Sequence, residues 1–223
     1  SNTAAAMIRD DGKFVAETAG NYLITATAGQ RSTSIPVVIY DRGIQREVIN
    51  VGTGLVQERH TSDFWVFEGV DKRDYAVSGT WGADGTTYFW DVTDPAQIRK
   101  IDSIQVDART VNDVKVSEDG RISVISREGA SSRRNGIVII DTTNPYDVNI
   151  ISEYTTNLTG GVHNVFIYQD HVFALSNGER FYVINIEDPK NPYEVGMFEI
   201  GEKGQAIHDV WIEDGIAYSS NWK

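Results

Sequence analysis

Apolar and polar positions alternate along most of this chain with the two-residue period of β-strands, and one alternating segment recurs. Its copies read SDFWVF (62–67), NDVKVS (112–117), HNVFIY (163–168) and HDVWIE (208–213). An acidic or amide residue opens each apolar run, at Asp63, Asp113, Asn164 and Asp209, so successive copies lie 50, 51 and 45 residues apart. A period of this length, with several short strands in each unit, is typical of the blades of a β-propeller.

Each repeat predicts four strands joined by tight turns. Inner strands are expected at 64–67, 114–117, 165–168 and 210–213, second strands at 75–79, 121–126, 172–176 and 216–220, third strands at 86–91, 136–141 and 180–186, and outer strands at 101–106, 148–154 and 194–200. Asp-Gly at 119–120 and 214–215 favours hairpins, and proline at 95, 145 and 189 marks strand ends because it cannot donate to a ladder. The fourth unit stops after its second strand, so we expect three and a half blades of a longer protein.

The first 40 residues carry a different pattern, with strands predicted at 12–18, 21–28 and 33–40. The order Gly20, Tyr22, Ile24 and Ala26 resembles the closing strands of a bacterial immunoglobulin-like domain, in which a tyrosine bonds back to the backbone at a corner. The resemblance implies that residues 1–40 are the C-terminal part of such a sandwich. Its other strands then lie outside this sequence or come from another chain. Residues 41–59 are polar and predict a linker before the blades at 60–223.

The third strand of each repeat and the turn after it also recur. GIVIIDTTNPYDV (136–148) and FYVINIEDPKNPYEV (181–195) resemble the repeat of the LVIVD-repeat proteins, a G-L-x-I-V-D strand followed by a D-P-x-x-P turn. TYFWDVTDPAQI (87–98) is a looser copy, and the second proline of the turn survives only at Pro192. The resemblance covers residues 60–223 and implies an exported or surface-associated bacterial propeller, often joined to immunoglobulin-like modules. We therefore expect an all-β protein in an extracytoplasmic location.

Charge and composition narrow the possible partners. The formal net charge is −12, and all of it belongs to residues 51–223, because residues 1–50 carry five basic and five acidic residues. Such an anionic region repels nucleic acid and anionic lipid, so neither is expected as a partner. The chain has no cysteine and no apolar run near the length of a membrane-spanning helix, so disulfides, thiolate metal sites and a transmembrane segment are not expected within it.

The residues that open the inner strands are the first candidate site, because equivalent positions of successive blades form a ring around the axis of a propeller. The ring contains His60, Asp63, Asn112, Asp113, His163, Asn164, His208 and Asp209. Imidazoles and carboxylates that converge on one axis can bind a divalent metal or a small ligand. The alternative, which we favour, is that these side chains pair with backbone groups where each strand enters its blade.

Two further sets of residues are candidates for contact with other proteins. Residues 127–135 predict a long loop between the second and third strands of one blade, with Arg127, Arg133 and Arg134 in an otherwise acidic region. Trp81 and Trp222 occupy similar positions in the first and fourth blades. They either form an aromatic patch on one face or, as we expect from the usual burial of tryptophan, pack between blades.

These observations favour a non-enzymatic function, because G-x-S-x-G, H-E-x-x-H, P-loop and G-x-G-x-x-G motifs are all absent. The leading hypothesis is an extracytoplasmic scaffold that binds other proteins, such as an accessory subunit of a cell-envelope or membrane-bound complex, and it requires no cofactor. The alternative is a metal- or small-ligand-binding propeller, an oxidoreductase or hydrolase, that acts at the channel mouth through Asp113, His163, His208 and Asp209.

Overall fold

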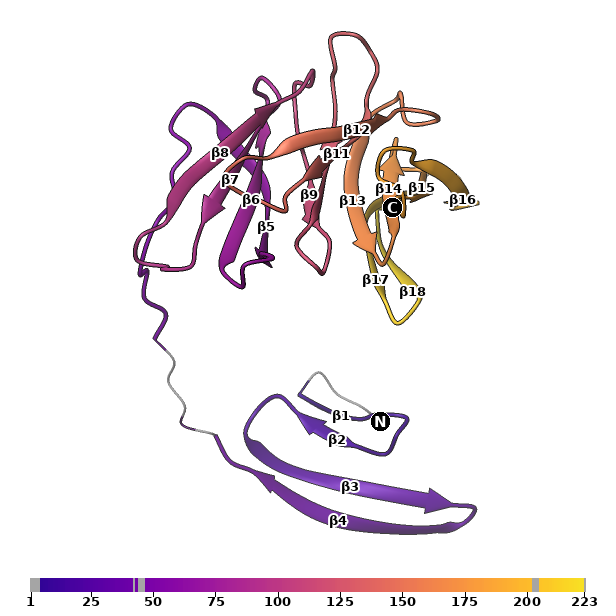
Figure 1. Cartoon of the computed structure of the whole chain (residues 1–223). Coiled ribbons are helices and arrows are strands. Elements are labelled where there is room, and N and C mark those ends of the chain that lie inside the picture. Colours follow the sequence, from indigo (N-terminus) through magenta and orange to yellow (C-terminus); the bar gives the residue numbers. More distant parts are fainter. Residues whose placement is uncertain (1–4, 42, 44–46, 202–204, 223) are drawn as a thin grey trace. The chain divides into compact units, whose positions relative to one another are not determined.

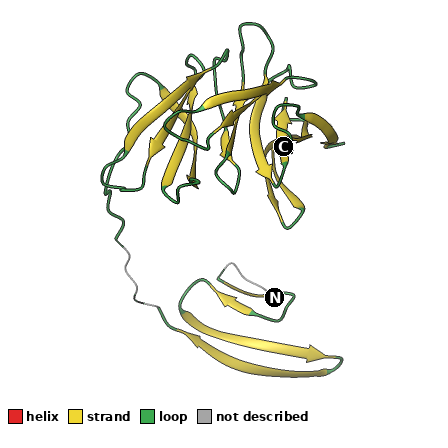
Figure 2. Ribbon diagram, in the orientation of Figure 1, coloured by secondary structure: helices red, strands yellow, loops and turns green. Residues whose placement is uncertain are grey.

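The computed structural model describes residues 5–41, 43, 47–201 and 205–222. The chain divides into two compact units, Ser1–Ile49 and Asn50–Lys223. Every regular element of the described residues is a β-strand, as Figure 2 shows. Within that described part, no helix has the length and apolar character needed to cross a membrane.

The first unit consists of two hairpins. β1 (Ala6–Ile8) pairs with β2 (Phe14–Ala16), and β3 (Gly20–Ala28) pairs with β4 (Arg31–Ile39), both antiparallel. The Tyr22 hydroxyl donates a hydrogen bond of 2.7 Å to the carbonyl oxygen of Thr18. This contact has the form that the immunoglobulin resemblance implies, although the assignment to that fold stays a prediction. Apolar side chains such as Leu23 and Ile35 remain exposed in this unit.

The second unit is a partial β-propeller, which confirms the predicted all-β fold class (Figure 1). Blade 1 contains β5 (His60–Glu68), β6 (Asp74–Trp81), β7 (Thr86–Asp91) and β8 (Arg99–Gln105), and blade 2 contains β9 (Val114–Val116), β10 (Ile122–Arg127), β11 (Gly136–Asp141) and β12 (Asn149–Tyr154). Blade 3 contains β13 (Val162–Tyr168), β14 (His171–Ser176), β15 (Arg180–Asn185) and β16 (Tyr193–Glu199). The described part of blade 4 contains β17 (Ala206–Glu213) and β18 (Ile216–Trp222). Each blade is antiparallel, and its strands follow chain order from the axis outward.

A β-bulge interrupts three of the four inner strands of the described residues next to the recurring acidic or amide residue. The register shifts between Thr61 and Phe64 in β5, between Val162 and Val165 in β13, and between Ile207 and Asp209 in β17. A bulge breaks the strict alternation of a strand and re-aims side chains. Two consecutive residues of these strands, rather than one, can therefore approach the axis.

The turn after each third strand is held by a repeated side-chain bond. Asp94, Asn144 and Asp188 each accept a hydrogen bond from the backbone N–H two residues later, at 3.0, 3.2 and 3.1 Å. Such Asx turns, together with the proline that follows each of these residues, fix the reversal between the third and fourth strands. The D-P signal of the sequence is thus a backbone device and not a ligand site.

The hydrophobic core lies between blades rather than within one layer. Three clusters fill the boundaries between blades 1 and 2, 2 and 3, and 3 and 4. Phe89 and Ile125 are fully buried at the first boundary, and Ile139 and Val165 at the second. A blade is therefore stable only against its neighbours, as expected for repeat architectures.

Replacing Phe89 with alanine is expected to lower the free energy of unfolding of the second unit by about 3–5 kcal/mol, because it removes a fully buried ring between two blades. Urea denaturation measures the change. Phe64→Ala is the matched control in the same blade, because the Phe64 side chain is 64% exposed, and it should cost far less. Equal losses for the two variants would contradict a core placed between blades 1 and 2.

Candidate functional site

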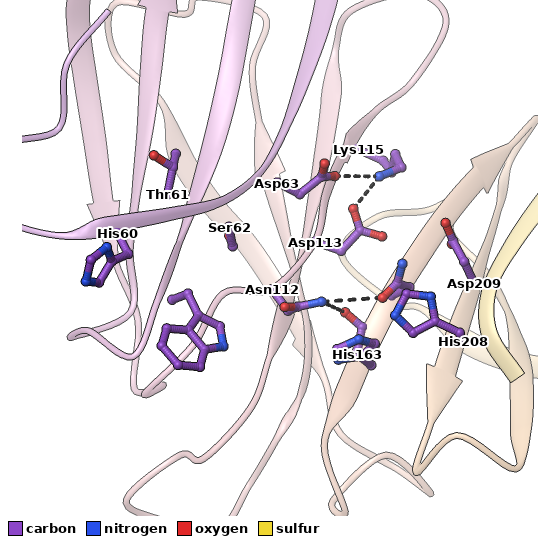
Figure 3. A pocket seen from close by; sticks show the side chains of 12 residues that line it. His60, Thr61, Ser62, Asp63, Asn112, Asp113, Lys115, His163, His208 and Asp209 are labelled. Carbon is purple, nitrogen blue, oxygen red and sulfur yellow. Dashed lines mark hydrogen bonds and ion pairs between the residues drawn. The ribbon is translucent and has the colours of Figure 1, made fainter. Parts of the chain in front are cut away.

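The inner-strand residues gather around a hollow of about 630 Å³ at one end of the propeller axis, which we call the mouth (Figure 3). The residues that line it come from all four blades. They are His60, Thr61, Ser62, Asp63, Trp81, Asn112, Asp113, Lys115, His163, Asn164, His208 and Asp209. The structure thus brings together every inner-strand candidate that the repeat identified.

Several of these side chains pair with the backbone of the next blade. The Ser62 hydroxyl donates to the carbonyl oxygen of Val111, and the Asn112 amide donates to the carbonyl oxygen of His163 at 2.9 Å. The Asp113 carboxylate accepts the backbone N–H of Val165 at 2.7 Å. Buried backbone groups need such partners, and here the partners lie across blade boundaries. These three contacts are of the structural kind that we favoured from the sequence.

A lysine that the sequence reading missed lies between two of the carboxylates. Lys115 Nζ contacts Asp63 Oδ2 at 2.9 Å and also forms an ion pair with Asp113 Oδ1. Burial and the neighbouring Asp63 carboxyl raise the pKa of Asp113, whereas the charge of Lys115 and the Val165 N–H oppose this rise and favour the carboxylate. Burial opposes the charge of Lys115, but its ion pair with Asp113 raises the pKa of the amine overall, so Lys115 remains a cation and is not a nucleophile at neutral pH.

The inner strands also carry a cluster of three aromatic side chains next to Lys115. Trp65, Phe166 and Trp211 stand two residues beyond the recurring acidic or amide position of their blades. Phe166 lies 4.7 Å from Trp211 and 6.4 Å from Trp65 between ring centroids, and Trp65 also meets Trp211 at 6.4 Å. Lys115 Nζ lies 5.0 Å from the Trp65 ring. The sequence carries a signal for this cluster. Side chains two residues apart on a strand lie on the same face, so the residues two positions after Asp63, Asp113, Asn164 and Asp209 are expected on the face of those residues.

The histidines of the ring differ in their surroundings. His163 Nδ1 lies 2.9 Å from Glu128 Oε1, and the His163 ring lies 5.2 Å from the ring of His208. His208 in turn lies 5.1 Å from the Trp222 ring. The hydrogen bond with Glu128 is the main cause of a raised pKa at His163, because it favours the imidazolium. His60 is exposed and pairs across the hairpin with Trp81.

The arrangement bears directly on the metal hypothesis. Among the residues that the structure describes, no group of three or more His, Asp or Glu side chains is close enough to hold a metal ion. Asp63 and Asp113 direct oxygens to Lys115, and His163 faces Glu128. Asp63, Asp113 and His163 are thus engaged with protein partners.

Two predictions about contact residues are wrong. Arg127 belongs to β10 rather than to an exposed loop, and its side chain is buried with Nη1 at 3.0 Å from Glu153 Oε2. Strand β10 runs one residue further than the pattern predicted, which draws Arg127 into the blade. Arg133 and Arg134 are exposed on the following loop, as expected.

Trp81 and Trp222 do not pack between blades. They are 53% and 62% exposed, respectively. Each ends the second strand of its blade, where it pairs with the first residue of the inner strand, so their equivalence is confirmed by strand register. The expectation that they pack between blades is therefore wrong, and the alternative of one aromatic patch stays a prediction.

The comparisons with known proteins support the fold. No protein-family model and no curated protein matches the chain. Among solved structures, a hypothetical selenium-binding protein from Sulfolobus tokodaii is 14% identical with a TM-score of 0.51, over 63% of this chain and 39% of that one. Sqt1 of Chaetomium thermophilum, solved bound to the N-terminus of the ribosomal protein L10, is 10% identical with a TM-score of 0.53, over 70% of this chain and 40% of that one. The chain is a β-propeller by fold and spans about two fifths of the solved chains it matches.

Replacing Asp113 with alanine is expected to lower the free energy of unfolding by about 3 kcal/mol or more, because it leaves the Val165 N–H without its buried acceptor and Lys115 with Asp63 alone. Asp209→Ala is the matched control from the equivalent position of blade 4, where the carboxylate accepts the N–H of Val210 in its own strand. Denaturant unfolding compares the two variants. Equal losses would show that the bond across blades contributes nothing.

The His163–Glu128 contact predicts a pH-dependent contribution to stability. Because the folded-state pKa of His163 lies above 6.5, this contribution is complete below pH 6.5 and is lost as the pH rises through the folded-state pKa. Titration of the His163 ring by NMR should give a raised pKa that Glu128→Gln lowers. Glu179→Gln, at an exposed glutamate, is the control and should leave the titration unchanged. If the pKa of His163 is the same in Glu128→Gln as in the wild type, the hydrogen bond with Glu128 is not the cause of the raised pKa.

Proposed function

We propose that this chain is a non-enzymatic β-propeller scaffold that binds other proteins at the mouth of its axis. One observation carries the proposal: the polar side chains deep in the mouth are paired with the protein itself, whereas the rim presents exposed aromatic and histidine side chains. Ser62, Asn112 and Asp113 join blades. Trp81 lines the mouth, Trp222 lines an adjoining hollow that shares His163 and His208 with it, and both tryptophans remain more than half exposed. Exposed tryptophan at the edge of a concave, partly polar site is typical of protein-binding surfaces.

The charge of the mouth indicates the chemistry of the partner. Asp63 and Asp209 are only partly buried, and the repeat region carries all of the net negative charge. A lysine or arginine of a partner gains both ion pairing with carboxylates and cation–π contact with tryptophan. The preferred occupant is therefore an extended segment with a basic side chain. Sqt1, a propeller of similar fold, was solved with the N-terminus of another protein, which is compatible with this mode of binding.

The loop with Arg133 and Arg134 extends the proposed surface. The Asp107 carboxylate accepts the backbone N–H groups of Ser131 and Ser132 at 2.7 and 3.0 Å, which anchors the loop on the segment that leads into blade 2. An anchored loop presents its arginines at low entropic cost. Acidic side chains of the same partner are the complement of these two arginines.

The cellular setting is part of the proposal. The LVIVD and immunoglobulin resemblances support an exported bacterial protein, and the absence of cysteine is compatible with that setting. We place the scaffold in a cell-envelope or membrane-bound assembly as an accessory subunit. Its role there is to hold partners in fixed geometry through a rigid set of blades.

Isothermal titration calorimetry with a set of lysine- and arginine-containing peptides tests the proposal. Peptides that bind the wild-type chain should lose affinity by about 30-fold or more in Trp81→Ala/Trp222→Ala, because the loss of even one tryptophan contact of hot-spot strength costs about 2 kcal/mol. Arg133→Ala/Arg134→Ala should weaken retention of a whole partner protein with an acidic contact surface but not of a basic peptide.

Tyr193→Ala is the control, because Tyr193 is 55% exposed on the outer strand of blade 3 and should not change peptide binding. Unchanged affinity in the double tryptophan variant, or equal loss in the control, contradicts binding at the mouth. Binding that requires added metal and is lost in His163→Ala/His208→Ala would instead favour the metal-dependent alternative.

A further inference from the structure

Another hollow, of about 540 Å³, lies between blades 2 and 3. It is lined by the turns that follow the inner strands of these blades, at 117–119 and 169–170, whereas the starts of the inner strands line the mouth. The hollow is therefore at the other end of the propeller, and we call it the notch. Its apolar lining includes Ile122, Ile151 and Ile167. Both blades have all four strands in the described residues.

The equivalent place between blades 1 and 2 is filled by a tyrosine from a turn of blade 2. The Tyr146 hydroxyl donates a hydrogen bond of 2.7 Å to Asp91 Oδ2. Its ring meets the Tyr75 ring edge-on, with 6.2 Å between the centroids. Arg73 and Arg99 contact the same carboxylate oxygen at 2.6 and 2.9 Å. One phenol and two guanidinium groups thus surround a carboxylate that is only 2% exposed.

In the notch, Ile122 and Asp141 stand where blade 1 has Tyr75 and Asp91. Strand β10 pairs Ile122 with Asp141 of β11, as β6 pairs Tyr75 with Asp91 of β7. Asp141 is exposed and Ile122 is only partly buried, whereas Tyr75 and Asp91 are both buried. The Asp141 carboxylate accepts the backbone N–H of Thr143 at 2.9 Å, and in the described part of the chain no cation or hydroxyl group forms an ion pair or hydrogen bond with it.

The residue that leaves the notch open is Lys190. It follows Pro189 in its turn as Tyr146 follows Pro145, and it lines the notch. A lysine has no ring to cover the apolar side chains, and its ammonium group stays in water while its stem packs. The turn of blade 3 therefore does not supply what the turn of blade 2 supplies at the neighbouring boundary.

The charge around the notch indicates the chemistry of its occupant. Five carboxylates line it against two cations, Arg121 and Lys190. The carboxylates are those of Glu118, Asp119, Asp141, Asp170 and Glu187. Arg121 is already paired with Asp119 at 3.5 Å. A site with apolar walls and an excess of negative charge favours a ligand that is both apolar and cationic.

We propose that the notch binds a polypeptide segment of a partner that presents a tyrosine next to an arginine. The tyrosine ring lies on Ile122 and Ile151, and its hydroxyl donates to Asp141. The arginine pairs with the same carboxylate. The chain itself provides the precedent, because Tyr146 and two arginines meet Asp91 in this way between blades 1 and 2. This site is separate from the mouth and does not depend on what the mouth binds.

Titration of the whole chain with a capped peptide, Gly-Arg-Tyr-Arg-Gly, followed by NMR of isoleucine methyl groups, tests the proposal. The methyl signals of Ile122 and Ile151 should shift on binding, whereas those of the fully buried Ile137 should not. Asp141→Asn should weaken binding by about tenfold or more, because it removes the charged acceptor. Asp147→Asn is the matched control, because it removes an exposed carboxylate of the same blade outside the notch, and it should leave the affinity unchanged.

Lys190→Tyr separates a built site from general attraction of a basic peptide. The substitution removes a cation, which by charge alone favours the peptide, but it introduces the side chain that fills the equivalent place between blades 1 and 2. Peptide binding should therefore be lost, and the temperature of thermal unfolding should rise. Lys190→Ala is the control, because it removes the same charge and leaves the notch open, and it should bind the peptide at least as tightly as the wild type. Circular dichroism verifies that each variant is folded.

Two results overturn the proposal directly. One is a wild-type chain in which the Ile122 and Ile151 methyl signals do not shift up to about 1 mM peptide. The other is unchanged peptide affinity in either Asp141→Asn or Lys190→Tyr. Binding that is kept in Asp141→Asn but lost in Trp81→Ala/Trp222→Ala places the peptide at the mouth, which overturns the notch and leaves the proposed function intact. Binding that is lost in Asp141→Asn and kept in the double tryptophan variant supports the notch.

Discussion

The fold depends on one constraint: inner strands that lie close to the axis must pair their backbone groups across blade boundaries. The bulges at the recurring residue interrupt the ladder to the second strand at this point. Asp113 meets this requirement, because its carboxylate accepts a hydrogen bond from the Val165 N–H in the next blade. Asn112 donates to the His163 carbonyl oxygen at the same boundary. Leaving such a buried group unpaired costs more free energy than one hydrogen bond contributes to stability. These contacts therefore constrain how neighbouring blades are placed.

The same constraint decides which residues remain available for function. Side chains that resemble a catalytic or metal site are largely engaged in holding blades together, and Lys115 compensates the charge of Asp113. A buried ion pair of this kind is costly to break but poor evidence of chemistry in itself. Recognition is left to the rim, where Trp81 and Trp222 project beyond the paired layer. The paired inner layer and the exposed rim therefore both follow from the pairing of inner strands across blade boundaries.

The repeat also explains why the hydrophobic core lies at the boundaries between blades. Every blade has two apolar faces, and the core is formed wherever the faces of neighbouring blades meet. Val77 and Val114 are buried in this way, because the alternation of each strand directs one set of apolar side chains to each face of the blade.

The sequence by itself determined the strands, the turns and the convergence of His163, His208 and the four recurring residues, because a repeated alternating pattern places equivalent positions equivalently. The sequence did not determine which side chains contact one another across strands and blades. The burial of Arg127 against Glu153, the exposure of Trp81 and Trp222 and the ion pair of Lys115 with Asp63 of blade 1 depend on how strands and blades adjoin. Those contacts join residues from different strands or blades, and only the tertiary structure decided them, since periodicity specifies the face on which a side chain lies but not what it meets there.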